Sequence, residues 1–390
     1  MSDRPSDEAR ALARRAEDFL AAEVIPLEPR WTLEELPPAA LDAVRAKARR
    51  AGLWAPQLPV ALGGLGLGFL DASPILEAAG RSLLGPLALG CAAPDEGNAH
   101  LLVCAGTDEQ KRRYLEPLAR AEIRSTFAMT EPAPGAGSDP RMMRTRAARD
   151  GDDWVIHGHK WFATGADGAA FAIVAAVTSA ESDPHPSATL FIVDAGTPGY
   201  DIVRRIPTMG GGTPGGHCEV RLSGCRVAAD HVLGGVGEGF RRMQERLGPA
   251  RLTHCLRWLG AAARALEVAR DRAREREAFG EPLAAHQSVA WSLADSAIEI
   301  HAARLMTYDA AARIAAGERA RVETSMCKVF VAETVDRVID RAIQVCGSLG
   351  FSHDLPLARM SEEARAFRIY DGPSEVHRRV IARDLLCDTD

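Results

Sequence analysis

Apolar residues recur every three or four positions in the first third of the chain, which is the spacing of one helix face. Near the start this stripe consists of Leu12, Ala16, Phe19 and Leu20. A second helix can end at Gly52, and its stripe consists of Leu41, Val44 and Ala48. Further on, Asp108 is predicted to cap a helix that runs through Tyr114 and Leu118. Residues 1–123 are therefore predicted to form a helical domain.

One glycine-rich segment, residues 63–68, invites comparison with a dinucleotide-binding fingerprint. Phe69 stands where the third glycine of that fingerprint belongs, and no strand is predicted before the segment. Because the fingerprint depends on a strand that leads into it, we interpret residues 63–68 as a structural loop.

The pattern changes to strands in the middle of the chain. Trp154 and Ile156 alternate with other residues after an Asp150-Gly151 turn, and Val220 alternates with Leu222 before another glycine. Short apolar runs flanked by Gly, Pro, Ser and Asp cover residues 171–177 and 190–193. Residues 124–236 are predicted to form a small, mostly antiparallel β unit.

Helical spacing returns from residue 237 to residue 390. One stripe consists of Trp291, Ala294, Ile298, Ala302 and Leu305, and another consists of Val331, Val335, Val338 and Ala342. These segments are long and rich in alanine, which suits close packing in a bundle. The predicted fold is mainly α with a central β-barrel-like domain, between an N-terminal helical domain and a C-terminal four-helix bundle.

Composition narrows the classes of function. The net charge is -6, with 47 basic and 53 acidic residues among 390, so the basic footprint of a nucleic-acid-binding protein is missing. The eight cysteines form no Cys-x-x-Cys pair, so no metal site is predicted. No run of 18 apolar residues and no apolar signal core at the start are found, and we expect a cytoplasmic protein that does not enter membranes.

Five segments, taken in order, resemble the acyl-CoA dehydrogenase family. They are GTDEQKRRYLEPLARAE (106–122), FAMTEP (127–132), HGHKWFATGA (157–166), REREAFGEPLAAHQ (274–287) and QVCGSLGF (344–351). Two more, RLGPARLTHCLRWLG (246–260) and YDGPSEVH (370–377), are most similar to one branch, whose animal members often carry a fused kinase-like domain. No such domain is present in this sequence.

The resemblance implies a flavoprotein that binds FAD and removes two hydrogens from an acyl-CoA, giving the 2-enoyl-CoA. This chemistry needs a carboxylate on one side of the substrate, the flavin on the other, and donors at the thioester oxygen. The resemblance also implies a homo-oligomer, either a dimer or a tetramer, and an electron-transferring flavoprotein as the electron acceptor.

Asp371 is the predicted catalytic base, because it matches the position where the family usually has a glutamate. Aspartate reaches about 1.5 Å less far, and the branch resembled here also has aspartate at this position. The family's second base position falls on Ala250, which cannot take a proton. The alternative is structural, since Asp371 before Gly372-Pro373 could end one helix and cap the next.

The remaining site residues are carried over from the family motifs. Positions that match contacts to the flavin are Phe127, Met129, Thr130, Phe162 and Thr164. Ser138 matches a serine near the CoA portion or the thioester, although its loop is about two residues longer than usual, and Arg251 and Gly372 match substrate contacts near the base. Contacts from a neighbouring subunit to the FAD match Arg276, Phe279 and Gln287, and contacts on the adenosine side match Gln344 and Gly347.

Two other functions stay open. One is a flavin oxidase on the same fold, similar to nitroalkane oxidase, which also uses an aspartate base. The other is a non-catalytic flavoprotein that acts as a binding module. The length, branching and hydroxylation of the acyl chain are not determined by the sequence.

Overall fold

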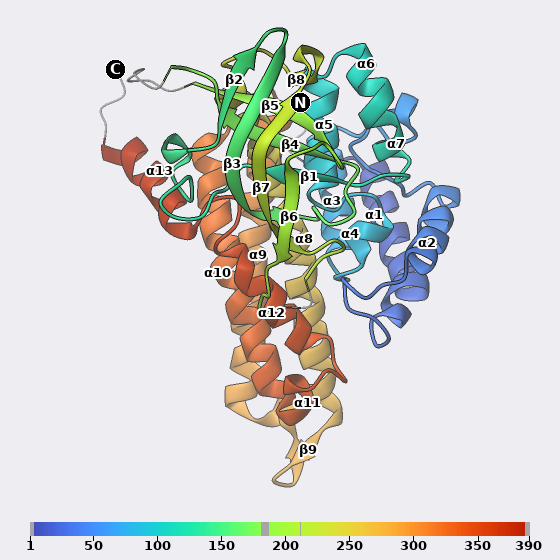
Figure 1. Ribbon diagram of the computed structural model, residues 1–390. Helices are drawn as coiled ribbons and strands as arrows, with labels where there is room; N and C mark the ends of the chain where they lie inside the picture. Colours follow the sequence, from blue (N-terminus) through green and yellow to red (C-terminus); the bar gives the residue numbers. More distant parts are fainter. Residues whose placement is uncertain (1–3, 181–186, 211, 387–390) are drawn as a thin grey trace.

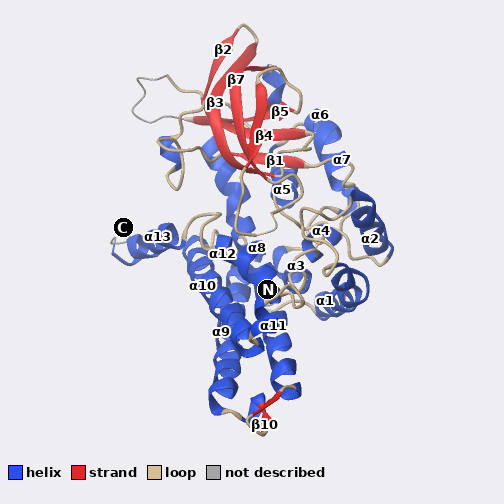
Figure 2. Cartoon of the chain, turned by 60° about the horizontal axis from the view of Figure 1, so that its bottom comes forward, coloured by secondary structure: helices blue, strands red, loops and turns tan. Residues whose placement is uncertain are grey.

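The computed structural model describes residues 4–180, 187–210 and 212–386. A helical N-terminal part, a sheet and a set of long helices follow one another along the chain (Figure 1). Figure 2 shows the large sheet at one end, the long helices extending away from it, and the small β10 strand at the far end of these helices. This arrangement confirms the predicted fold class. The exact domain boundaries, 1–123, 124–236 and 237–390, stay a prediction.

The N-terminal part consists of short and medium helices. They are α1 (Asp7–Phe19), α2 (Pro38–Arg50), α3 (Phe69–Ala79), α4 (Gly85–Ala88), α5 (Asp95–Ala105), α6 (Asp108–Gln110) and α7 (Glu116–Ala119). Residues 63–68 form a loop, as predicted. The predicted cap was wrong by one residue, because the Thr107 side chain accepts from the Gln110 N–H while Gln110 bonds back to the Thr107 N–H. This reciprocal pair makes Thr107 the cap and Asp108 the first helical residue.

The middle part is an eight-stranded sheet with the order β6-β7-β3-β2-β4-β5-β8, and β1 pairs with β4. Its strands are β1 (Ser125–Ala128), β2 (Arg146–Asp150), β3 (Asp153–Thr164), β4 (Phe171–Val177), β5 (Ala188–Asp194), β6 (Tyr200–Arg205), β7 (His217–Val227) and β8 (Val232–Leu233). Most pairs are antiparallel, while β1 and β2 both run parallel to β4. Every residue of β4 is buried, which explains its continuous apolar run.

The C-terminal part is built on three long helices. They are α8 (Gly239–Glu275), α9 (Gln287–Ala315) and α10 (Arg321–Cys346), and the strands β9 (Glu277–Ala278) and β10 (Glu281–Pro282) form a hairpin between α8 and α9. Three shorter helices complete the chain, namely α11 (Ser348–Phe351), α12 (Leu357–Phe367) and α13 (Ser374–Leu386). Both α12 and α13 pack against α10.

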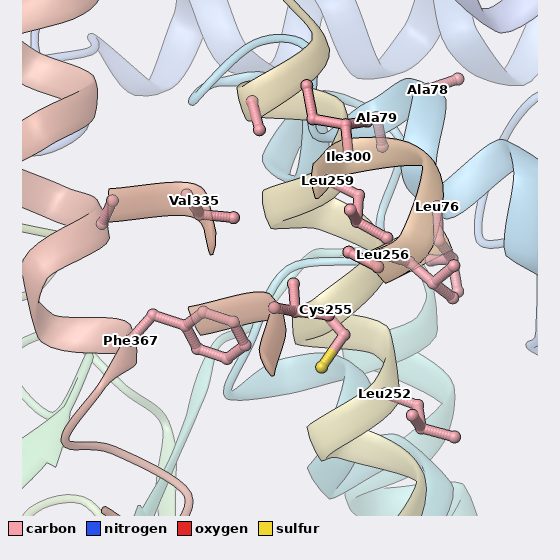
Figure 3. Close-up of a cluster of buried hydrophobic side chains, with 14 of the residues drawn as sticks. Leu76, Ala78, Ala79, Leu252, Cys255, Leu256, Leu259, Ile300, Val335 and Phe367 are labelled. Atoms are coloured by element: carbon pink, nitrogen blue, oxygen red, sulfur yellow. The ribbon is translucent and has the colours of Figure 1, made fainter. Parts of the chain in front are cut away.

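The largest core joins the N-terminal and C-terminal helices around α8. Figure 3 shows Leu252, Cys255, Leu256 and Leu259 of α8 among side chains from α3, α9, α10 and α12. The predicted stripe of α10 lies in this core, since its members are all buried, at Val331, Val335, Val338 and Ala342. The helix α8 therefore positions the two helical parts against each other.

The predicted helix is present as α9, but its apolar stripe does not pack within the chain. Trp291, Ile298 and Leu305 are 62%, 65% and 59% exposed. The face that α9 buries against the chain is instead made of Ser296, Ile300, Ala303, Thr307, Ala310 and Ala311. Alanine and hydroxyl side chains let α9 approach α8 and α10 closely, and the larger apolar stripe faces outward.

Candidate active site

Asp371 lies in a tight turn between α12 and α13. Its φ angle is +54°, a left-handed conformation that aspartate tolerates better than most residues, and Gly372 follows at +101°. A Cβ on Gly372 would lie 2.7 Å from Nε2 of His377, so a side chain does not fit there.

Main-chain carbonyls of this turn are held by cationic or imidazole side chains. Arg251 Nε of α8 donates to the Asp371 carbonyl at 2.9 Å, and His377 Nε2 of α13 lies 3.2 Å from the same oxygen. Lys328 Nζ of α10 donates to the Phe367 carbonyl at 2.5 Å and to the Gly372 carbonyl at 3.4 Å. Three elements thus fix the turn without using the Asp371 carboxylate.

One oxygen of the Asp371 carboxylate is left for another partner. Oδ2 is buried and accepts no hydrogen bond from any described residue. The nearest ionisable group is His254 of α8, whose Nε2 lies 3.4 Å from Oδ2, and the two side chains are 15% and 18% exposed. If Asp371 capped α13, its carboxylate would accept hydrogen bonds from main-chain N–H groups of that helix. Because Oδ2 accepts none from a described residue, the structure favours the interpretation of Asp371 as a base.

The charged groups around the turn are mostly positive. Burial lowers the pKa of the Arg251 guanidinium, and the Asp371 carboxylate opposes this effect. Burial likewise lowers the pKa of Arg246, again opposed first by Asp371, and lowers the pKa of Lys328 to about 8. Burial also lowers the pKa of His377 to about 4, with Arg251 adding to the shift. Arg246, Arg251 and Lys328 therefore all interact electrostatically with the Asp371 carboxylate.

The predicted flavin-facing residues are brought together by bonds between β1 and β3. The Trp161 N–H donates to the Thr130 carbonyl at 2.9 Å, and the Thr126 hydroxyl donates to the Thr164 carbonyl at 2.8 Å. These bonds place Phe127, Met129 and Thr130 beside Phe162 and Thr164.

Phe162 sits in an irregular stretch of β3. The pairing of β3 with β7 shifts register between Lys160 and Ala163, and Phe162 has a φ of +53° and is 41% exposed. Bulges and strained backbone conformations are frequent at binding sites, and an exposed phenylalanine there suits contact with a flat aromatic ligand. Thr164 Oγ1 lies 3.0 Å from His217 Nδ1 at the same edge.

A buried ion pair supports this flavin-facing segment. Lys160 is fully buried, and its Nζ lies 2.9 Å from Glu131 Oε1 and donates to the Met129 carbonyl at 3.0 Å. Glu131 also accepts from the main-chain N–H groups of Ala136, Arg144 and Thr145, at 3.2, 2.7 and 2.9 Å. The pair therefore anchors the long loop that carries Ser138, whose own side chain is exposed.

A cavity of about 370 Å³ lies between α3, α5 and α8. Its apolar lining includes Trp54, Leu58, Leu67, Phe69 and Leu76, and α8 contributes Arg246, Pro249 and Ala250. This volume falls within the range of about 300–1,000 Å³ for small-molecule sites. Asp371 does not line the cavity. Arg246 connects the cavity with the turn that carries Asp371. It lines the cavity, and the Asp371 carboxylate raises its pKa against the effect of burial. Its guanidinium carbon lies 4.1 Å from the centroid of the Phe127 ring.

Five predicted cofactor residues lie elsewhere. Arg276, Phe279 and Gln287 surround the β9–β10 hairpin and are exposed, with Phe279 97% exposed. Gln344 and Gly347 are exposed at the end of α10. Figure 1 places this hairpin at the end of the molecule opposite the sheet, so one chain does not bring these residues to Phe162 and Thr164.

Three family models together match nearly the whole chain. They are the N-terminal domain of acyl-CoA dehydrogenase over residues 6–122, the middle domain over residues 126–225 and the C-terminal domain over residues 237–386. The chain belongs to the acyl-CoA dehydrogenase family. The resemblance inferred from the sequence segments is therefore confirmed, and membership supports an oxidoreductase.

Similar curated proteins place the chain in the expected branch. The probable acyl-CoA dehydrogenase FadE2 of Mycobacterium tuberculosis is 43% identical over 89% of this chain and 85% of its own length. Acyl-CoA dehydrogenase family member 11 of Gallus gallus is 40% identical over 93% of this chain and 46% of its own length. The chain thus spans about half the length of that animal relative.

Solved structures agree on the fold. A structure from Mycobacterium abscessus that carries the name of an acyl-CoA dehydrogenase has a TM-score of 0.92 and 39% identity, with 98% of both chains covered. Butyryl-CoA dehydrogenase from Megasphaera elsdenii has a TM-score of 0.87 and 27% identity, with 99% of this chain and 100% of that chain covered.

Sequence reasoning missed several residues around Asp371. His254 stands three positions after Arg251, so the two share a helix face, and this spacing was the available signal. His377 ends the segment YDGPSEVH, but no role was predicted for it, and Lys328 belongs to none of the family segments. Within the described part of the chain, no helix is long and apolar enough to cross a bilayer, and no cluster of three metal-ligating side chains is found.

Proposed function

We propose that this acyl-CoA dehydrogenase family member is an FAD-dependent enzyme that converts an acyl-CoA to the 2-enoyl-CoA, with Asp371 as the base. The observation that carries the proposal is the buried, unbonded Oδ2 of Asp371 inside a ring of cationic side chains. A buried carboxylate oxygen with free acceptor capacity is what proton abstraction next to a carbonyl requires.

Asp371 Oδ2 takes the proton from the α-carbon of the acyl chain. FAD, when bound, would supply the acceptor for the hydride from the β-carbon, and the electron pair left by the α-proton would form the new double bond. Arg251 holds the turn that aims Asp371, and Gly372 leaves room beside it. The cavity lined by Trp54, Phe69 and Ala250 receives the acyl chain, because it is mostly apolar and begins on the same helix as Arg251.

The residues present suit the flavin in two separate groups. Phe127, Met129, Thr130, Phe162 and Thr164 offer aromatic and hydroxyl contacts at one edge of the sheet, and Ser138 lies on the loop that Glu131 anchors there. At the far end of the molecule are the exposed polar and aromatic side chains expected for the pyrophosphate and adenosine, contributed by Arg276, Phe279, Gln287 and Gln344, with Gly347. Paired arginine donors match a pyrophosphate well.

This separation leads us to propose a homo-oligomer in which each FAD is held by two subunits. The exposed stripe of Trp291, Ile298 and Leu305 supports this assembly. These three large apolar side chains are spaced seven residues apart and are exposed to water in a single chain. Whether two or four subunits assemble is left to measurement. We propose an electron-transferring flavoprotein as the acceptor, and we place the reaction in the cytoplasm, since the described cysteines are free thiols.

The test is an anaerobic panel of acyl-CoAs of different length, branching and hydroxylation, added to the purified yellow protein. We expect at least one acyl-CoA to bleach the flavin absorbance and to yield the 2-enoyl-CoA. A protein that is colourless and cannot be reconstituted with FAD would remove the proposal. Oxygen consumption with hydrogen peroxide formation, or bleaching by a nitroalkane alone, would support a flavin oxidase instead.

A further inference from the structure

A row of four side chains leads from the interior to the Asp371 carboxylate. Trp258 Nε1 of α8 lies 2.7 Å from the Tyr370 hydroxyl, which lies 3.4 Å from His254 Nδ1. The other ring nitrogen, His254 Nε2, lies 3.4 Å from Asp371 Oδ2. The His254 and Tyr370 rings meet edge to face, with centroids 4.8 Å apart. Each contact joins α8 to the turn after α12.

The hydrogen-bonding groups in this row fix which side chain donates and which accepts at each contact. The indole N–H of Trp258 can only donate, so the Tyr370 oxygen accepts from it. Burial raises the pKa of the Tyr370 phenol, so the hydroxyl keeps its proton, and the remaining direction for that proton is His254 Nδ1. An Nδ1 that accepts leaves the proton of a neutral imidazole on Nε2. That proton is on the nitrogen that lies 3.4 Å from Asp371 Oδ2, an oxygen that accepts no hydrogen bond from any described residue.

His254 stays neutral in this setting. Burial lowers its pKa well below the ordinary value, and Arg257, Lys328 and Arg246 lower it further. The charged and titratable groups that surround the pair come from several elements, and they are Glu96 of α5, Arg246, Arg251, Cys255 and Arg257 of α8, Lys328 of α10, and His377 of α13. The neutral His254 ring can therefore offer an N–H donor to the Asp371 carboxylate without adding another charge.

We propose that His254 is a positioning residue for the Asp371 base, held as the Nε2–H tautomer by the Tyr370 hydroxyl and the Trp258 indole. Its Nε2–H turns toward Oδ2, limits the rotation of the short aspartate side chain and stabilises the carboxylate until the substrate proton is taken. Neighbouring Cys255 points into the core with Phe367, which anchors this section of α8 (Figure 3). The inference rests on the proposed function, because it assigns the base its orientation.

The kinetic test measures single-turnover flavin reduction against pH in His254→Leu and His254→Gln. We expect His254→Leu to reduce the limiting rate about 10- to 100-fold, the range for losing one hydrogen bond to a charged group. The pH dependence of the rate should also change in His254→Leu, because the carboxylate loses a hydrogen-bond donor. Glutamine keeps an N–H donor near the Nε2 position, so His254→Gln should recover most of the rate.

Two controls separate positioning from packing. In the Asp371→Asn background, His254→Leu should cost almost nothing more, because the group that it serves is gone. The exposed ring of His157 on β3 provides a matched change, and His157→Leu should leave the reduction rate unaltered. An unchanged rate in His254→Leu, or an equal loss with and without the Asp371 carboxylate, would overturn the proposal.

A second measurement does not depend on turnover. Proton–nitrogen correlation spectra of protein labelled with ¹⁵N-histidine report the tautomer of each ring, and the His254→Gln spectrum identifies the signal of His254. We expect a protonated Nε2 and an unprotonated Nδ1 at pH 7, and a loss of this preference in Tyr370→Phe. A protonated Nδ1 or a doubly protonated ring would contradict the inference. If no acyl-CoA bleached the wild-type flavin, the proposed function would fail while this spectrum still decided the tautomer.

Discussion

Arg251 binds the main-chain carbonyl of Asp371, at 2.9 Å, while Oδ2 of the Asp371 carboxylate accepts no hydrogen bond from any described residue. The main chain and the side chain of Asp371 therefore have separate roles. The backbone of Asp371 holds the turn between α12 and α13 in place, and its side chain is available for chemistry. A substitution that changes only the carboxylate should therefore alter the reaction and spare the fold.

Asp371→Asn tests this separation directly. Asparagine tolerates the left-handed φ of this position and leaves the Arg251 bond intact, but it cannot accept the α-proton. We expect flavin reduction by a good acyl-CoA to slow at least about 100-fold, while FAD content and acyl-CoA binding persist. Single-turnover bleaching measures the rate, and Asp371→Glu should be milder because its carboxylate reaches about 1.5 Å further. A wild-type rate in Asp371→Asn would remove Asp371 from the mechanism.

Arg276→Ala tests the proposed contribution of one subunit to the FAD of another. Arg276 is exposed beside the hairpin, and loss of a charge-assisted bond to a pyrophosphate should weaken FAD retention about 10- to 100-fold. We expect the oligomer to loosen with it, as seen by flavin release and light scattering. Arg270, also exposed near the end of α8, gives the control, and Arg270→Ala should keep both properties.

Ile298→Asp approaches the same assembly from the exposed face of α9. A carboxylate in place of a 65% exposed isoleucine should leave the single chain folded and disrupt the association of subunits. Light scattering should show smaller particles, and FAD retention should fall as the two halves of its site separate. A variant of unchanged mass would show that the stripe of Trp291, Ile298 and Leu305 is not the interface.

Glu131→Gln should destabilise the middle domain by about 3–5 kcal/mol at pH 7, because it leaves the Lys160 ammonium buried without its partner. Burial would raise the pKa of Glu131, but Lys160 and several hydrogen bonds outweigh this and hold it at about 2. A carboxylate whose folded pKa is below its ordinary 4.5 contributes stability above pH 4.5 and loses it toward pH 2. Urea unfolding should therefore show the variant and the wild type converging below pH 4.

His377 should make the protein sensitive to mild acid. Burial, then the Arg251 charge, lower its pKa to about 4, so the folded protein keeps the ring neutral while the unfolded chain protonates it near pH 6.5. The stability is thus complete above pH 6.5 and falls as the pH drops toward 4. We expect a loss of about 2 kcal/mol between pH 7.5 and 5 that His377→Gln does not show in urea unfolding. Equal losses in both proteins would assign the acid sensitivity to other groups.

The sequence by itself determined the order of the three parts and the family. A continuous apolar run placed the strand Phe171–Val177, because every residue of this strand is buried. Helical periodicity placed the helix that buries Val331 and Val338, because one whole face of it lies in the core. Short motifs that resemble the family then led to the prediction of Asp371 as the base and Arg251 as its neighbour, and these roles stay predictions.

Only the tertiary structure determined what each apolar helix face packs against. The stripe of Trp291, Ile298 and Leu305 has the spacing of a core face and yet is exposed, because periodicity reports that a face is apolar and not what covers it. The partner of Asp371 was hidden for a related reason. His254 and Tyr370 stand 116 residues apart, and their contact exists only because α8 and the turn after α12 pack around one core. Contacts between distant segments depend on how whole elements pack, which no local pattern records.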